Sequence, residues 1–183
     1  MTPVTVTWKL TREANSLVID YSVTNSSDAQ ILVLDEVVGT SSKGLVRLPD
    51  RFVARYDKAS DTVVLTAGYV PPALAMGPGT GAGSTSETMP LGRPVAPGGS
   101  VTGTKRVALP LTAWHPDLGT GPLAPMPAQP LKAVVEVGWV PAQGVTWEQN
   151  PAADGTMLKA PSAHFVAVNQ KYARGAAQSL AVN

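Results

Sequence analysis

The stretch VTVTWKL, residues 4–10, decides the fold class, because its apolar and polar residues alternate without a break. Valine, tryptophan and leucine occupy the even positions, while threonine and lysine occupy the odd ones. A period of two is the pattern of a β-strand with one buried and one solvated face. The stretch LVIDYSVT, residues 17–24, repeats the pattern after a polar linker, so we predict an antiparallel hairpin.

Further strand-like runs follow at intervals of roughly ten residues, a spacing typical of β-sandwiches and barrels. They are ILVLDEVV from residue 31, LVRL from 45, RFVARY from 51, TVVLTAGYV from 62, GSVTGTKRVAL from 99, LKAVVEVGWV from 131 and HFVAVNQKY from 164. No window has a long helical period, and only the tail, residues 174–183, is expected to be a short helix or flexible. We therefore predict that residues 1–183 form one all-β, antiparallel sandwich of about seven to nine strands.

Residues 71–130 interrupt this pattern, since they hold 12 of the 17 prolines and 10 of the 17 glycines. Proline lacks the N–H that a sheet uses and glycine weakens strand interiors, so regular structure should be sparse here. We predict two long loops, residues 71–98 and 110–130, around a strand near 99–109. A linker between two domains is the alternative, although neither flank alone has a full set of strands.

The segment PVAPGGSVTGTKRVALP, residues 94–110, combines a proline and two glycines in a turn with a Thr- and Val-containing run. It resembles the turns that lead into strands in many immunoglobulin-like bacterial domains. The resemblance covers under a tenth of the chain. It implies a broadly immunoglobulin-like sandwich and carries no function.

The glycine-rich segment AMGPGTGAGSTSE, residues 75–87, raises the question of a phosphate site. A Walker loop needs a lysine and a hydroxyl residue directly after its last glycine, and no lysine follows here. A dinucleotide-binding loop needs GxGxxG between a strand and a helix, whereas this spacing is GxGxGxG with no helical pattern behind it. The segment is interpreted as a surface loop.

Composition excludes several classes of function. The net charge is +1, which provides no basic field for nucleic acid or anionic membranes. There is no cysteine, so disulfides, thiolate metal sites and a cysteine nucleophile are excluded. No signal-peptide pattern and no run of about 18 apolar residues is found, so we expect a soluble chain without membrane insertion.

No catalytic constellation is found either. The two histidines, His115 and His164, have no neighbours at metal-ligand spacing, and no GxSxG motif is present. Asp35 and Glu36 are adjacent on a predicted strand, so their side chains should point to opposite faces. We predict no cofactor, no metal and no enzyme activity.

The tryptophans divide into two groups. Trp8 and Trp139 lie in alternating strands and are predicted to be core residues. Trp114, followed by His115 and Asp117, lies in the second long loop, and Trp147 lies in the turn-like segment GVTWEQNP. A tryptophan in a loop either caps the open end of a sandwich or anchors an interface.

The leading hypothesis is a non-catalytic protein-binding or structural module, which can be a subunit of a larger assembly, because long loops on a rigid scaffold usually carry recognition. The candidate contact residues are Trp114, His115, Asp117, Met76, Met89 and Trp147. If Trp114 is a contact, Trp114→Ala should weaken binding with little change in melting temperature. The alternatives are a carbohydrate or small-ligand domain that stacks on Trp114 and Trp147, and self-association through the edge of residues 4–10.

Overall fold

The computed structural model describes residues 3–48, 50–71, 88–118, 123, 125–127 and 132–180, and it is almost entirely β-structure, as predicted. Within these residues no helix is long and apolar enough to cross a bilayer. The elements in chain order are β1 (Val4–Glu13), β2 (Ser16–Asn25), β3 (Ile31–Ser41), β4 (Gly44–Arg47), β5 (Val53–Asp57), β6 (Thr62–Ala67), β7 (Thr88–Val95), β8 (Ser100–Ala108), β9 (Lys132–Pro141), β10 (Trp147–Pro151), β11 (Met157–Pro161), α2 (Ala163–Asn169), β12 (Lys171–Arg174) and β13 (Gln178–Ser179).

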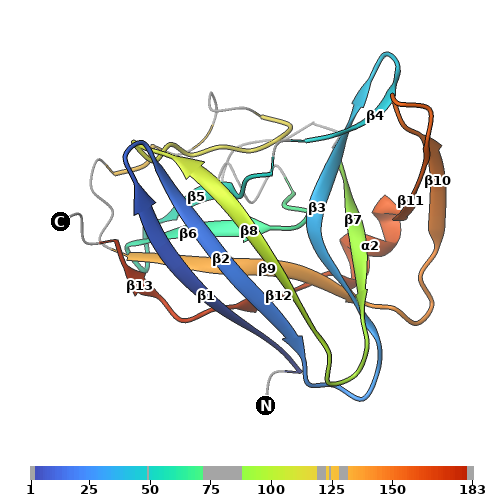
Figure 1. Ribbon diagram of the computed structural model, residues 1–183, viewed down its shortest axis with the longest axis horizontal. Helices are drawn as coiled ribbons and strands as arrows, with labels where there is room; N and C mark the ends of the chain where they lie inside the picture. The colour runs from blue at the N-terminus through green and yellow to red at the C-terminus, as the bar shows by residue number, and fades with distance from the viewer. Residues whose placement is uncertain are drawn as a thin grey trace.

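Two sheets pack face to face (Figure 1). The front sheet has the strand order β1-β2-β8, with antiparallel neighbours. The back sheet has eight strands: the order β4-β3-β9-β6-β5 is extended by β7 on β3 and by β12 and β13 on β9. The pair β6–β9 is parallel, which makes the back sheet mixed rather than purely antiparallel.

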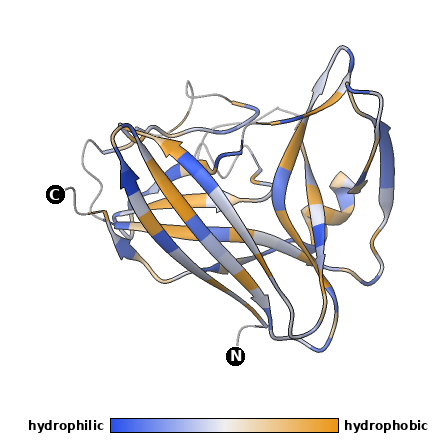
Figure 2. Ribbon diagram, viewed as in Figure 1, coloured by the Kyte–Doolittle hydropathy of each residue, from blue (hydrophilic) through white to orange (hydrophobic). Residues whose placement is uncertain are grey.

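The alternation at the N-terminus produces the front sheet. Val4, Val6 and Trp8 are buried, while the intervening threonines are exposed. β2 continues the same face in register, since Trp8 lies opposite Tyr21. Figure 2 shows the resulting apolar and polar bands along β1 and β2. These residues pack against buried valines and leucines of β6 and β9, and Trp139 belongs to the same core, so the prediction of Trp8 and Trp139 as core residues is confirmed.

The first predicted loop, residues 71–98, contains a strand. Residues 88–95 form β7, which pairs with β3 from Ile31 to Gly39. β7 includes Pro90 and Pro94, and it lies at the edge of the back sheet, where a missing N–H does not break a ladder. In the second predicted loop, the described residues after β8 are irregular apart from a bridge between Ala54 and Trp114.

The C-terminal region also differs from the prediction. The run from residue 164 begins inside α2, because the Ser162 hydroxyl accepts a hydrogen bond from the Phe165 N–H and caps the helix. α2 packs its buried Val166 against Leu32 and Leu34 on the outer face of the back sheet. The described part of the tail, residues 174–180, contains no helix, and β12 and β13 both pair with β9, whereas residues 181–183 lie outside the described residues.

The hairpin β10–β11 lies beside the back sheet (Figure 1). Its inward face packs Leu158 and Ala160 against Val38, Leu45 and Leu91. Residue 147 therefore begins a strand instead of lying in a turn.

The edge strand β1 is partly covered by the C-terminal segment. The Trp8 indole N–H donates to the Ala176 carbonyl, and the Gln178 amide donates to the Trp8 carbonyl. Gly175 packs so tightly on the indole that a Cβ there would overlap it. A strand from another copy would have to displace these contacts, which weighs against pairing at this edge.

A phenol buried beside the back sheet leads to a pH prediction. The Tyr172 hydroxyl donates to the Tyr69 carbonyl and accepts from the Gln170 amide. Burial, followed by the negative charge of Glu136, raises the pKa of Tyr172 from 10.0 to about 12. A tyrosine in the unfolded chain titrates near pH 10, so Tyr172 stabilises the fold below that pH and loses this contribution as the pH rises through about 12.

We therefore expect the stability advantage of the wild type over Tyr172→Phe to shrink by roughly 2 kcal/mol between about pH 9 and about pH 12. Urea unfolding of both proteins at a series of pH values measures this difference. Parallel losses in the two proteins would contradict the assignment.

Candidate functional site

A cleft of about 240 Å³ lies where both sheets contribute side chains, close to the segment between β4 and β5. Its lining is unusually rich in charge for a chain with few charged residues. The charged residues in the lining are Asp35, Glu36, Arg47, Asp50, Arg51 and Lys105. Trp114, from the segment after β8, completes one side.

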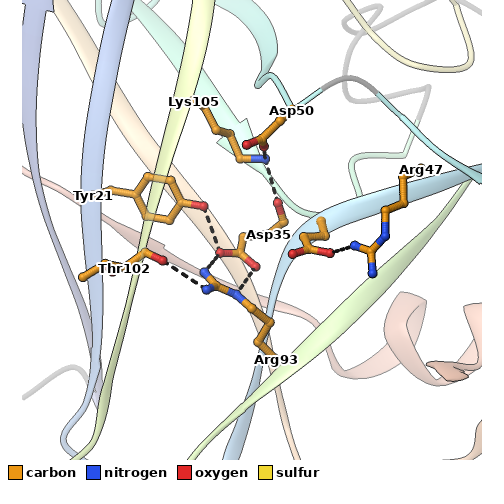
Figure 3. A network of polar contacts seen from close by, with 8 residues as sticks. Tyr21, Asp35, Arg47, Asp50, Arg93, Thr102 and Lys105 are labelled. Carbon is orange, nitrogen blue, oxygen red and sulfur yellow. Dashed lines mark hydrogen bonds and ion pairs between the residues drawn. The ribbon is translucent and has the colours of Figure 1, made fainter. Parts of the chain in front are cut away.

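Asp35 is the centre of a polar network between the sheets (Figure 3). Its side chain is 2% exposed, and its carboxylate accepts hydrogen bonds from the Tyr21 hydroxyl at 2.8 Å and from Arg93 Nε at 2.9 Å. The second Arg93 nitrogen completes a bidentate ion pair. Arg93 also donates to the Thr102 carbonyl at 3.0 Å, so β3, β7, β2 and β8 are joined at one point.

The same network fixes the protonation of the phenol. Burial, followed by the negative charge of Asp35, raises the pKa of Tyr21 well above its usual value. The phenol is therefore a neutral hydrogen-bond donor at physiological pH. Both Asp35 oxygens are used by donors from the fold, so this carboxylate holds the sheets together.

Lys105 projects from β8 toward β3 and is almost completely buried, with 5% of its side chain exposed. Its ammonium donates to the Asp35 carbonyl at 2.7 Å and to the Asp50 carboxylate at 2.7 Å. Asp50, by contrast, is 68% exposed. A buried cation is thus neutralised by a carboxylate that extends in from solvent (Figure 3).

Glu36 follows Asp35 on β3, but its ion pair is separate from the Asp35 network. It pairs with Arg47 of β4. Both side chains of that pair are largely exposed. Exposed pairs contribute about 0–1 kcal/mol, so Glu36 and Arg47 shape the rim of the cleft more than they stabilise it.

Arg51 lies over Trp114 at the cleft, with its guanidinium carbon 3.4 Å from the ring centroid. Trp114 is half-buried, packs against Val53 and Val70, and exchanges two backbone hydrogen bonds with Ala54. Partial desolvation lowers the pKa of Arg51, but a guanidinium remains charged in proteins. Among the described residues no carboxylate forms an ion pair with Arg51.

His115 and Asp117 follow Trp114 but turn into the fold. His115 is fully buried and its Nε2 lies 2.7 Å from the Val70 carbonyl. The Asp117 carboxylate is 4% exposed and accepts from the Thr88 hydroxyl, while the Asp117 N–H donates to His115 Nδ1. These contacts hold the segment after β8 against β7 and against the segment that follows β6, so we do not retain either side chain as a partner contact.

The other candidate contacts do not gather at the cleft. Met89 is half-buried and packs under the β10–β11 hairpin. Trp147 begins β10, is 39% exposed, and has the Lys159 ammonium 4.6 Å from its ring centroid. Trp147 is outside the described lining of the cleft that contains Trp114. Met76 lies outside the described residues.

Sequence reasoning identified Trp114 but missed the charged residues around it. Arg93 and Lys105 both contact Asp35, but they follow it in the sequence by 58 and 70 residues. No local spacing links the three residues. Arg51 was hidden inside a predicted strand. The signal available in the sequence was that Asp35 and Lys105 occupy positions expected to face the core in strands whose other inward residues are mostly apolar.

Within the described residues, no three histidine, aspartate or glutamate side chains are grouped as a metal site would require. Comparisons of the chain with protein-family models, with curated proteins and with solved structures gave no match.

Proposed function

We propose that the protein is a non-catalytic binding module that recognises a protein partner at the cleft beside Arg51 and Trp114. The observation that carries the proposal is the stack of these two side chains. The guanidinium carbon lies over the indole, 3.4 Å from the ring centroid, Arg51 is exposed, and it has no carboxylate partner in the described part of the chain. Arginine and tryptophan are the residues most often found at the energetic centre of protein interfaces.

The stack also favours binding because it is preorganised. The ring of Trp114 is fixed by Val53, Val70 and the bridge to Ala54, so little side-chain entropy remains to be lost there. The guanidinium keeps its N–H groups at the edge of the plane, where they can form a bidentate contact with a partner.

Small-ligand binding at the same cleft is the second candidate, favoured by the enclosed cation Lys105. The size of the cleft separates the two. Small-molecule sites usually measure about 300–1,000 Å³, whereas this cleft measures about 240 Å³. That volume suits one inserted side chain better than a whole ligand.

Carbohydrate stacking has weaker support. The Trp114 face is occupied by Arg51, and the Trp147 ring lies beside Lys159. A sugar ring would have to displace a cation from each indole, and the two indoles do not line one cleft in the described structure.

The proposal is tested by quantitative capture of binding partners from the cells that make the protein. Arg51→Gln should reduce capture of a specific partner by at least about tenfold, which corresponds to one desolvated charged hydrogen bond. Arg12→Gln, which changes an exposed arginine at the end of β1, is the matched control and should retain capture.

Trp114→Ala is a poorer probe than the sequence indicated. Removing the ring would uncover Val53 and Val70, so we expect a loss of about 2 kcal/mol in stability together with any loss of binding. Loss of capture with Trp147→Ala but not with Arg51→Gln would move the contact to the β10–β11 hairpin and contradict the proposal.

A further inference from the structure

The Lys105 ammonium donates one of its hydrogen bonds to an exposed acceptor, the Asp50 carboxylate, which another group entering the cleft can replace. An ammonium has three N–H donors. One is held by the Asp35 carbonyl of β3, inside the fold, and another by the Asp50 carboxylate. The ammonium is buried between the sheets, so it lacks the hydration that stabilises the charge of an exposed lysine and depends on a counter-charge instead.

Asp50 is bound to the fold in a different way from Asp35. It belongs to the short segment between β4 and β5, its side chain is 68% exposed, and its ion pair is with Lys105. The Asp35 carboxylate, in contrast, is held by Tyr21 and Arg93 at full burial. Asp50 is therefore the carboxylate that water can take up, and its exchange for another carboxylate would leave the Lys105 ammonium paired.

The charge around Lys105 shows what could replace Asp50. Asp35 is neutralised by Arg93, and Glu36 by Arg47. If Asp50 withdraws, the lining contains two cations without a described carboxylate partner, Lys105 and Arg51. Such a site attracts a carboxylate, and its planar guanidinium can bind both oxygens.

We propose that Asp50 occupies the place that an acidic side chain of the partner takes, so that Lys105 and Arg51 together recognise a carboxylate. Asp50 acts as an internal competitor that keeps the buried ammonium neutralised until the partner's aspartate or glutamate enters. This inference rests on the proposed function and names the chemical group that enters the cleft.

Acetate is the probe, titrated at constant ionic strength into the full chain and followed by NMR shifts of the Lys105 and Trp114 backbone amides. Asp50→Ala should bind acetate about tenfold more tightly than the wild type, because the internal carboxylate is gone. Acetamide, which has the same shape without the charge, should produce no saturable shift in the variant. Absence of saturable acetate binding to Asp50→Ala would overturn the proposal.

Glu36→Ala is the matched control, because it removes one negative charge from the same cleft but leaves Lys105 paired with Asp50. If Glu36→Ala strengthens acetate binding as much as Asp50→Ala does, the effect is general electrostatics and the proposal fails. Lys105→Met in the Asp50→Ala background should remove acetate binding; retained binding would also overturn it. The comparison of Asp50→Ala with Glu36→Ala stands even if the Lys105 variant does not fold.

Partner binding at the cleft and recognition of a carboxylate are tested by separate results. If Arg51→Gln loses the partner but Asp50→Ala binds no acetate, the cleft binds a partner through a group other than a carboxylate. If Arg51→Gln retains the partner, the proposed function fails, whatever the result of the acetate titration.

Discussion

Replacing Asp35 with alanine should lower the free energy of unfolding by about 3 kcal/mol, one of the largest effects of any single substitution outside the apolar core. The change leaves the Tyr21 hydroxyl without an acceptor and the Arg93 guanidinium without a counter-charge, both at a point that joins the two sheets. Because Arg93 is one-third exposed, water can recover part of the loss. Chemical denaturation of the variant measures the difference.

Glu36→Ala is the control for Asp35→Ala. It removes a neighbouring carboxylate that also forms an ion pair with an arginine, but both members of that pair are exposed. We expect a loss below about 1 kcal/mol. Equal losses for the two variants would show that burial does not distinguish the two ion pairs and that the Asp35 network is not a structural link.

Gly103→Ala should cost about 3 kcal/mol, because a methyl group at this position would overlap the ring of Tyr21 on the neighbouring strand. The ring cannot move aside freely. Its hydroxyl is bound to Asp35, and its ring packs against Phe52 in a tilted arrangement with the ring centroids 6.0 Å apart. Thermal or urea unfolding of the variant tests the expected loss.

A double-mutant cycle identifies the cause. In a Tyr21→Ala background the added methyl has space, so Gly103→Ala should cost less than about 1 kcal/mol there. An unchanged cost in that background would mean that the glycine is needed for its backbone conformation and that the Tyr21 contact is incidental.

The sandwich was predictable where each strand carries its own pattern. Residues 4–24 alternate so regularly that the buried face and the antiparallel hairpin follow from the sequence, and β1 and β2 have these properties. The buried strand β9 was also evident as a continuous apolar run, since it is covered on both faces.

The elements that were missed depend on neighbours instead. β7 contains prolines that a strand tolerates only at an edge, and its edge position is a property of the whole sheet. The sequence of α2 has a strand-like composition. The start of the helix is indicated by a single residue, the N-cap Ser162. β10 and β11 have exposed outer faces, so their pairing leaves little apolar alternation in the sequence.

The candidate site was predictable only as far as one tryptophan. Trp114 was recognisable from its loop context, but whether its ring was free or stacked depended on Arg51, 63 positions away. The burial of His115 depends in the same way on the Val70 carbonyl, which comes from the segment after β6. Contacts between segments distant in sequence decide the site.

Binding at the cleft is tested most directly by placing a photo-reactive benzoylphenylalanine at position 47, on the exposed rim of the cleft, and at position 12 on β1 as the control. Irradiation in the producing cells should give a cross-linked protein from position 47 and none from position 12, and the adduct should be lost when Arg51→Gln is added. An adduct from position 12 with none from position 47, or an adduct that survives Arg51→Gln, would contradict binding at the cleft.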